Sequence, residues 1–111
     1  MLVGDMLEAI ADVESFVAGM DRATFATDRR TIHAVCRCLE IVGEAAGRLS
    51  AQACAAMDDI AWHQLRGVRN RIVHAYFDAD FAVVWTIATV DLPEVASRLR
   101  THAPRLDPPP T

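Results

Sequence analysis

Residues 29–49, RRTIHAVCRCLEIVGEAAGRL, place apolar side chains at alternating steps of three and four along the chain. This spacing matches one face of an α-helix and predicts a helix over these residues, with Asp28 as its N-cap. A long helix with a single apolar stripe needs a partner that covers it. The stripe is uninterrupted and consists of Ile32, Val35, Leu39, Val42, Ala46 and Leu49.

The preceding segment offers that partner. Its apolar residues follow the same alternating steps and predict a helix over about residues 2–18 that stops near Gly19. Residues 21–27 predict a connection that holds one short turn. The two long helices are expected to pack antiparallel, as neighbouring helices of a bundle do. The second stripe consists of Val3, Met6, Ile10, Val13, Val17 and Met20.

The second half of the chain predicts shorter elements. Residues 50–62 are mixed in character and predict a short helix and a loop, and a helix follows over about 62–76. Asp78 and Asp80 then cap a last helix. Pro93 either kinks this helix or restarts it, because proline is tolerated in a first turn. Its apolar stripe consists of Phe81, Val84, Ala88, Leu92, Val95 and Leu99.

Composition indicates a single all-α domain. The chain has 111 residues, too few for two domains, and its apolar fraction of 52% excludes a disordered chain. Alanine-rich sequence with few internal glycines favours helices. The expected fold is therefore an up-down bundle of four to five helices over residues 1–102. Residues 103–111 include four prolines and predict a disordered tail.

Charge and cysteine content narrow the functional class. The net charge is −4 and every basic residue is an arginine, so nucleic-acid binding by general charge is disfavoured and any phosphate contact must be local. Cys36, Cys38 and Cys54 suit neither a zinc site nor a disulfide framework, and are expected to fill the core in a reducing compartment. The longest apolar run, residues 81–90, is too short to span a bilayer. We expect a cytoplasmic protein that enters no membrane.

Residues 66–76, RGVRNRIVHAY, gather three arginines, an asparagine, a histidine and a tyrosine in a chain that is elsewhere apolar helix. Buried polar groups without partners cost free energy, so this density indicates a site. Arg69 and His74 are five residues apart and lie ~140° apart around a helix axis. If both act on one substrate atom, either the arginine side chain curls round the helix or a second copy supplies the missing group. A two-fold dimer would do so, because an isologous interface joins the same residues of both subunits.

Glu40 and Glu44, one turn apart on the helix over residues 29–49, leave two interpretations open. Like charges at this spacing usually mark a solvated face. Alternatively, the two carboxylates meet the arginines of the helix over residues 62–76 and orient them.

Residues 69–76, RNRIVHAY, resemble the Arg-x4-His-x-Tyr motif of the HepT-like toxins, a branch of the HEPN superfamily of helical ribonucleases. Other segments strengthen the resemblance, which covers nearly the whole domain. The second-helix signature LEIVGEA at 39–45 and the lead-in WHQLRG at 62–67 precede the motif, and YF at 76–77, VVW at 83–85 and DLP at 91–93 continue from it.

The resemblance implies a homodimer with a metal-independent endoribonuclease site in the cleft where two motif helices meet. It implies that the protein is the toxin of a toxin–antitoxin pair. Arg69 and His74 would be catalytic and Asn70 would support them. Tyr76 would be the residue to which the partner antitoxin, an MNT-type nucleotidyltransferase, transfers AMP. No metal or other cofactor is implied.

The chemistry of these residue types agrees with the implied roles. Metal-free RNA cleavage needs a base for the 2′-hydroxyl proton, an acid for the leaving 5′-oxygen and positive charge at the phosphate. His74 can transfer protons near neutral pH, whereas Arg69 stays charged and stabilises phosphoryl oxygens. Two copies of His74 across a two-fold axis supply both acid and base, and the expected product carries a 2′,3′-cyclic phosphate. Arg66, Arg71 and Asn70 are expected at the substrate phosphate.

A different class of function is also compatible with the sequence. A non-catalytic helical dimer could dock a nucleotidyltransferase, or hold a nucleotide, through the same arginines. In that case His74 is a core histidine, and Tyr76 is a half-buried aromatic with its hydroxyl at the surface. The other histidines, His33, His63 and His102, are expected to be structural or exposed.

Overall fold

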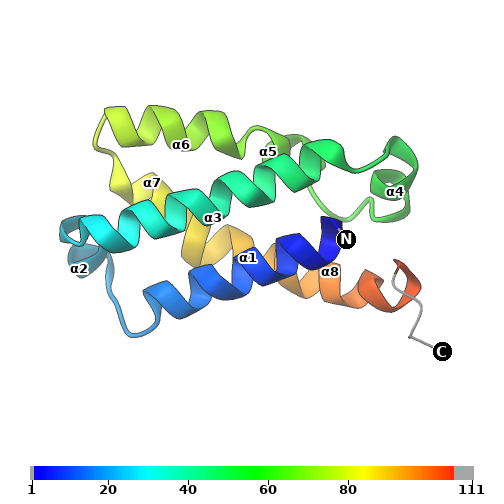
Figure 1. Ribbon diagram of the computed structural model, residues 1–111, viewed down its shortest axis with the longest axis horizontal. Helices are drawn as coiled ribbons and strands as arrows, with labels where there is room; N and C mark the ends of the chain where they lie inside the picture. The colour runs from blue at the N-terminus through cyan, green and yellow to red at the C-terminus, as the bar shows by residue number, and fades with distance from the viewer. Residues whose placement is uncertain (1, 107–111) are drawn as a thin grey trace.

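The computed structural model describes residues 2–106, with side chains as far as residue 102, and has the predicted all-α fold (Figure 1). No strand is present within that range. The bundle consists of α1, α3, the α5–α6 pair and the α7–η1–α8 path, with α2 and α4 as short helices beside them. The elements are α1 (Leu2–Val17), α2 (Arg22–Thr27), α3 (Arg29–Arg48), α4 (Ala51–Ala56), α5 (Trp62–Arg66), α6 (Val68–Phe77), α7 (Phe81–Thr86), η1 (Ile87–Asp91) and α8 (Leu92–Leu106).

α1 and α3 form the centre of the bundle and run antiparallel, as predicted (Figure 1). Their apolar stripes supply much of the core, and Met6, Ile10 and Leu39 are fully buried. Each such side chain contributes roughly 1.5–3 kcal/mol by leaving water. At the start of α3 the Asp28 carboxylate accepts a 3.0 Å hydrogen bond from the Thr31 amide, which confirms the predicted cap.

The connection predicted over residues 21–27 is almost entirely helical. The Asp21 carboxylate caps α2 by accepting a 2.7 Å hydrogen bond from the Thr24 amide. Phe25 is fully buried, and its ring centroid lies 5.2 Å from that of Trp85. The capping side chain and the buried aromatic both help to hold this six-residue helix.

Helical residues continue through Pro93, and the backbone just before it is π-helical. The Leu92 amide donates to the Ile87 carbonyl, five residues earlier. Proline has no amide proton and its ring crowds the carbonyl four residues before it, so a wider turn at this point relieves both constraints. α8 then runs four residues past the predicted domain end at 102. The rest of the predicted tail, residues 107–111, lies outside the described residues.

The described surface carries few large apolar side chains. Those that are well exposed are Phe16, Val73, Phe77 and Val90. Across residues 2–106, no helix combines the length and the apolar character needed to cross a bilayer. Two of the exposed side chains, Val73 and Phe77, belong to α6, the helix that carries the polar motif.

Candidate functional site

α6 is fixed against the bundle by a row of buried side chains, Val68, Ile72 and Ala75. Its close approach to α3 depends on Gly43. A Cβ atom added at Gly43 would lie 3.0 Å from Val68 Cγ1 and 3.4 Å from the Leu65 carbonyl oxygen. A glycine at this position therefore lets the helices approach, and it determines where the outward side chains of α6 stand.

Arg69 and His74, the two predicted catalytic residues, are both exposed but lie on different sides of α6. Arg69 lines a hollow of about 390 Å³ between α1, α3 and α6, together with Glu40 and Glu44. The five-residue separation places His74 ~140° further round the helix. A single protomer therefore does not bring the two side chains to one point.

Glu40 and Glu44 show features of both interpretations drawn from the sequence. Glu40 forms a 3.3 Å ion pair with Arg37 of its own helix, and the two side chains are 40% and 71% exposed. Such a pair contributes little to stability, because solvent screens it. Both carboxylates also border the hollow that Arg69 lines. They form a solvated face that shares its hollow with one motif arginine.

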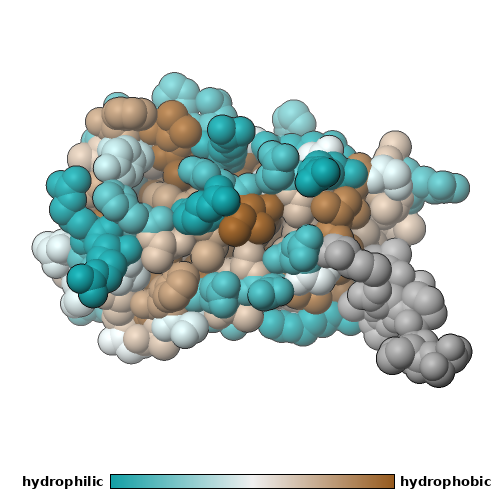
Figure 2. Space-filling model, in the orientation of Figure 1, coloured by the Kyte–Doolittle hydropathy of each residue, from teal (hydrophilic) through white to brown (hydrophobic). Residues whose placement is uncertain are grey.

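Val73 and Phe77 form an exposed apolar pair one turn apart on α6, with exposed fractions of 43% and 81%. Around the helix they lie between Arg69 and His74. Figure 2 shows apolar surface over the end of the molecule where α6 terminates. Large apolar side chains that are exposed together often mark a site of association. α6 thus presents an apolar strip with a guanidinium on one side and an imidazole on the other.

α6 ends directly after the motif in a Schellman turn. The Asp80 amide donates to the Ala75 carbonyl at 2.8 Å, and the Ala79 amide donates to the Tyr76 carbonyl at 3.2 Å. Ala79 takes the left-handed conformation that this turn requires, with φ of 54°. The predicted end of this helix, at about residue 76, is confirmed.

Tyr76 is half-buried and leans toward α3. Its hydroxyl oxygen lies 3.1 Å from His33 Nε2. Phe77 and Phe81 contact its ring edge-on, with centroids 5.7 Å and 6.3 Å away. A hollow of about 270 Å³ between α3 and α6 is lined by both His33 and Tyr76. The tyrosine hydroxyl is thus near the surface and has a histidine as its partner.

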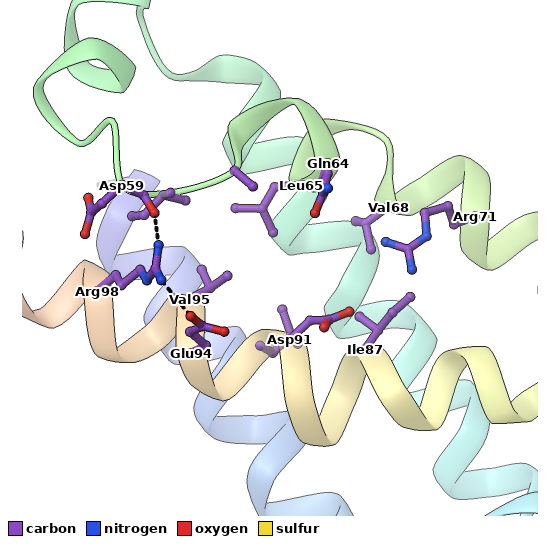
Figure 3. A pocket seen from close by; sticks show the side chains of 13 residues that line it. Asp59, Gln64, Leu65, Val68, Arg71, Ile87, Asp91, Glu94, Val95 and Arg98 are labelled. Carbon is purple, nitrogen blue, oxygen red and sulfur yellow. Dashed lines mark hydrogen bonds and ion pairs between the residues drawn. The ribbon is translucent and has the colours of Figure 1, made fainter.

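The other two motif arginines point elsewhere. Arg66 donates to Cys54 Sγ at 3.2 Å, which holds it against α4. Arg71 lines a separate cavity of about 170 Å³, and its guanidinium points from α6 toward η1 (Figure 3). Asn70 is exposed one turn before His74 on α6. The structure does not gather the three arginines into one cluster, and the roles of Arg66, Arg71 and Asn70 at a substrate phosphate stay predictions.

Part of the polar rim of the Arg71 cavity is paired internally. Arg98 forms a 2.6 Å ion pair with Glu94 and also donates to the Asp59 backbone carbonyl, as Figure 3 shows. His102 lies 2.7 Å from an Asp59 carboxylate oxygen, and this hydrogen bond lowers the pKa of Asp59. These contacts attach α8 to the segment before α5, so this rim has a structural role.

The three cysteines are buried and free, in agreement with the prediction that they fill the core. Burial raises the pKa of the Cys36 thiol to about 11, and the charge of Glu40 adds to the effect. The thiol therefore stays protonated at neutral pH and is a poor nucleophile and a poor ligand. In the part of the chain that the structure describes, no three His, Cys, Asp or Glu side chains are grouped as a metal site would require.

His33 is exposed, which agrees with the expectation that it is structural or exposed, but its contact with Tyr76, 43 residues later, was not predicted. No local spacing links the two positions, because only the packing of α3 against α6 brings them together.

Comparison with known proteins gives consistent matches over most of the chain. The sequence profile of the family described as Ribonuclease HepT-like matches residues 6–101. A Thermococcus cleftensis protein named "Probable ribonuclease HepT" is 32% identical over 94 residues, which cover 85% of this chain and 86% of that protein. "Putative RNase MJ1216" of Methanocaldococcus jannaschii is 32% identical over 91 residues, which cover 82% of this chain and 75% of that protein. No solved structure is significantly similar to the chain.

Proposed function

Because the chain belongs to the HepT-like ribonuclease family, we propose that it is a metal-independent endoribonuclease and the toxin of a toxin–antitoxin pair. The observation that carries this proposal is the outer surface of α6. Arg69 and His74 are exposed there on the two sides of the apolar pair Val73 and Phe77. One helix thus combines a contact surface with the two groups that the reaction needs.

The contact surface favours a homodimer. Two copies that pack Val73 and Phe77 against each other remove this apolar surface from water. An isologous contact then gathers both copies of Arg69 and His74 around one interface. The site is complete only in the dimer, because one protomer holds the two side chains ~140° apart around α6.

In the proposed reaction the RNA 2′-oxygen bonds to the adjacent phosphorus, and the bond from phosphorus to the 5′-oxygen breaks. One His74 imidazole takes the 2′-hydroxyl proton, and the imidazole of the second copy gives a proton to the 5′-oxygen. Arg69 stays charged, so its guanidinium stabilises the non-bridging phosphoryl oxygens. The products carry a 2′,3′-cyclic phosphate and a 5′-hydroxyl.

Regulation is proposed to act through Tyr76. Seven residues separate Tyr76 from Arg69, so the two lie on the same side of α6, about two turns or ~10 Å apart. AMP transferred to the hydroxyl by an MNT-type nucleotidyltransferase adds an anion and a bulky base along this side. RNA phosphate then competes poorly for Arg69, and cleavage stops.

The experiment measures cleavage of RNA by the purified protein in the presence of EDTA. Wild-type protein is expected to cleave and to leave 2′,3′-cyclic phosphate ends. His74→Ala is expected to lose a factor of about a hundred or more in rate. His63→Ala, which changes an exposed histidine of α5, is the matched control and is expected to cleave like wild type. Wild-type activity that EDTA abolishes and Mg²⁺ restores would contradict the mechanism.

The same variants separate the alternative, a non-catalytic helical dimer that binds a nucleotidyltransferase or a nucleotide. Only the ribonuclease needs the imidazole, so a His74→Ala protein that remains toxic in cells would favour the binding module. A Tyr76→Phe protein that the nucleotidyltransferase still silences would refute the regulatory part of the proposal.

A further inference from the structure

The contact between His33 and Tyr76 joins α3 and α6 and takes no part in the cleavage steps described above. Tyr76 is the only tyrosine of the chain. Its hydroxyl oxygen lies 3.1 Å from His33 Nε2, and the two rings are tilted by 43° with centroids 5.6 Å apart. The contact is therefore a hydrogen bond between the phenol hydroxyl and an imidazole ring nitrogen rather than a parallel stack.

The surroundings of this pair leave room for an incoming group. The hollow of about 270 Å³ that both side chains line has a wall of apolar residues from α6. Its other charged or titratable members, Arg37, Glu40 and Cys36, all come from α3. Arg37 is paired with Glu40 at 3.3 Å, and Cys36 is buried. His33 is exposed and is the titratable side chain that contacts the tyrosine hydroxyl.

We propose that His33 is the base that receives the Tyr76 hydroxyl proton when AMP is transferred to this tyrosine, an inference that rests on the proposed modification. A tyrosine hydroxyl is a weak nucleophile while it keeps its proton. A neutral imidazole with its proton on Nδ1 presents the Nε2 lone pair to the phenol. The target protein thus supplies the base, and the partner enzyme supplies the bound nucleotide.

In this step the Tyr76 oxygen bonds to the α-phosphorus of ATP. The bond between that phosphorus and the oxygen that bridges to the β-phosphate breaks, and pyrophosphate leaves with the electron pair. The phenol proton passes to His33 Nε2 along the 3.1 Å hydrogen bond. The imidazolium then returns its proton to solvent, which it can reach because the side chain is exposed.

The first experiment measures the rate of AMP addition by intact mass, with ATP, Mg²⁺ and an MNT-type nucleotidyltransferase. His33→Gln keeps a hydrogen-bonding side chain that cannot accept a proton, and His33→Ala leaves space for imidazole from solution. Both are expected to be modified about a hundredfold more slowly than wild type. Added imidazole is expected to accelerate His33→Ala and not His33→Gln. His63→Gln is the matched control and is expected to be modified at the wild-type rate.

Two results would overturn the role of His33. Modification of His33→Gln at the wild-type rate would show that a hydrogen bond alone is enough. A slow His33→Ala protein that imidazole does not accelerate would show that the ring acts through structure. RNA cleavage by both variants is expected to equal that of wild type, since His33 is outside the proposed cleavage machinery.

A second measurement examines His33 without the partner enzyme. The chain has one tyrosine and no lysine, so N-acetylimidazole is expected to place a single hydroxylamine-reversible acetyl group on Tyr76. Faster acetylation of wild type than of His33→Gln supports the proton-acceptor role, and equal rates contradict it. Wild-type protein that takes up no AMP in the first experiment would overturn the proposed modification, while acetylation still decides whether His33 activates the hydroxyl.

Discussion

Substitution of Gly43 tests most directly how closely α6 packs against α3. In Gly43→Ala the new methyl group meets Val68 Cγ1 at 3.0 Å, and valine in a helix has little rotamer freedom to move away. Overpacking of this kind costs ~1–3 kcal/mol, and the better helix propensity of alanine offsets up to ~1 kcal/mol of it. We expect a net loss of about 1 kcal/mol in the free energy of unfolding, measured by urea denaturation, together with slower RNA cleavage.

Gly47 of the same helix provides the control for this substitution. It is exposed, and a Cβ atom added there meets nothing within 4 Å. Gly47→Ala is therefore expected to stabilise the protein by ~0.5–1 kcal/mol through helix propensity alone. Equal effects at the two positions would show that the approach of α6 to α3 does not depend on Gly43.

Ala79 offers a second test at the scale of one residue. Its φ of 54° is unfavourable for an L-residue with a Cβ atom and is tolerated because the Schellman turn fixes it. Ala79→Gly is expected to raise the melting temperature, by an amount that corresponds to ~1 kcal/mol or less. Ala79→Val is expected to lower it, since a branched Cβ fits this conformation poorly. Opposite changes in two calorimetric scans confirm the turn, and changes of the same sign contradict it.

The sequence located the motif residues on one helix but could not complete the site. The spacing of Arg69 and His74 already implied opposite sides of α6, because helix geometry is local. The placement of Arg66 on Cys54 and of Arg71 toward η1 depends on neighbours from other elements. The contact of His33 with Tyr76 likewise depends on tertiary packing, which sequence periodicity does not predict.

Helix caps give an expected pH dependence at the scale of the element. Hydrogen bonds from the Thr31 amide and hydroxyl lower the pKa of Asp28 below its ordinary 3.8. The unfolded chain therefore binds the proton more readily than the folded chain. The cap's contribution to the free energy of unfolding is complete above about pH 4 and is lost as the pH falls through the lowered pKa of Asp28 in the folded chain. Asp28→Asn keeps a capping oxygen but cannot titrate. Its melting temperature is expected to fall less than that of wild type between pH 7 and about pH 3.

Circular dichroism melts across this range measure the effect. Asp58→Asn, which removes an exposed carboxylate from the segment after α4, controls for the change in net charge. If the melting temperatures of wild type and Asp28→Asn fall by the same amount on acidification, protonation of this cap does not contribute to the loss of stability.

Helices with a clear apolar stripe and a capping residue could be predicted from the sequence. Elements that depend on several weaker sequence features could not. The stripe of residues 29–49 and the cap at Asp28 gave α3 almost to the residue. The helix expected over 62–76 is divided at Gly67, because a glycine there ends α5 and precedes α6. The π-helical turn before Pro93 is one of several ways to accommodate a proline, and the sequence alone does not distinguish among them.

At the scale of the whole molecule, the apolar strip of α6 predicts how the protein associates. Phe77 is 81% exposed in the single chain, so Phe77→Asp removes nothing from the core. It places a charge in the proposed dimer contact, which disfavours burial there. We expect a monomer by sedimentation, a nearly unchanged melting profile of the monomeric fold, and loss of RNA cleavage. Val90→Asp, which changes an exposed apolar residue of η1, is the control.

Mixing wild-type and His74→Ala protein tests whether one site uses both protomers. A mixed dimer keeps a single imidazole, so the proposed reaction lacks either its acid or its base there. After verified subunit exchange, activity is expected to fall with the square of the wild-type fraction. A fall in simple proportion to that fraction would contradict a site built from both chains.

In the proposed dimer, RNA cleavage depends on the encounter of two molecules, because one helix holds the guanidinium and the imidazole on different sides. At concentrations well below the dissociation constant of the pair, doubling synthesis would quadruple the number of working assemblies. Low basal expression would then produce few active dimers, whereas a brief rise in translation would produce disproportionately many.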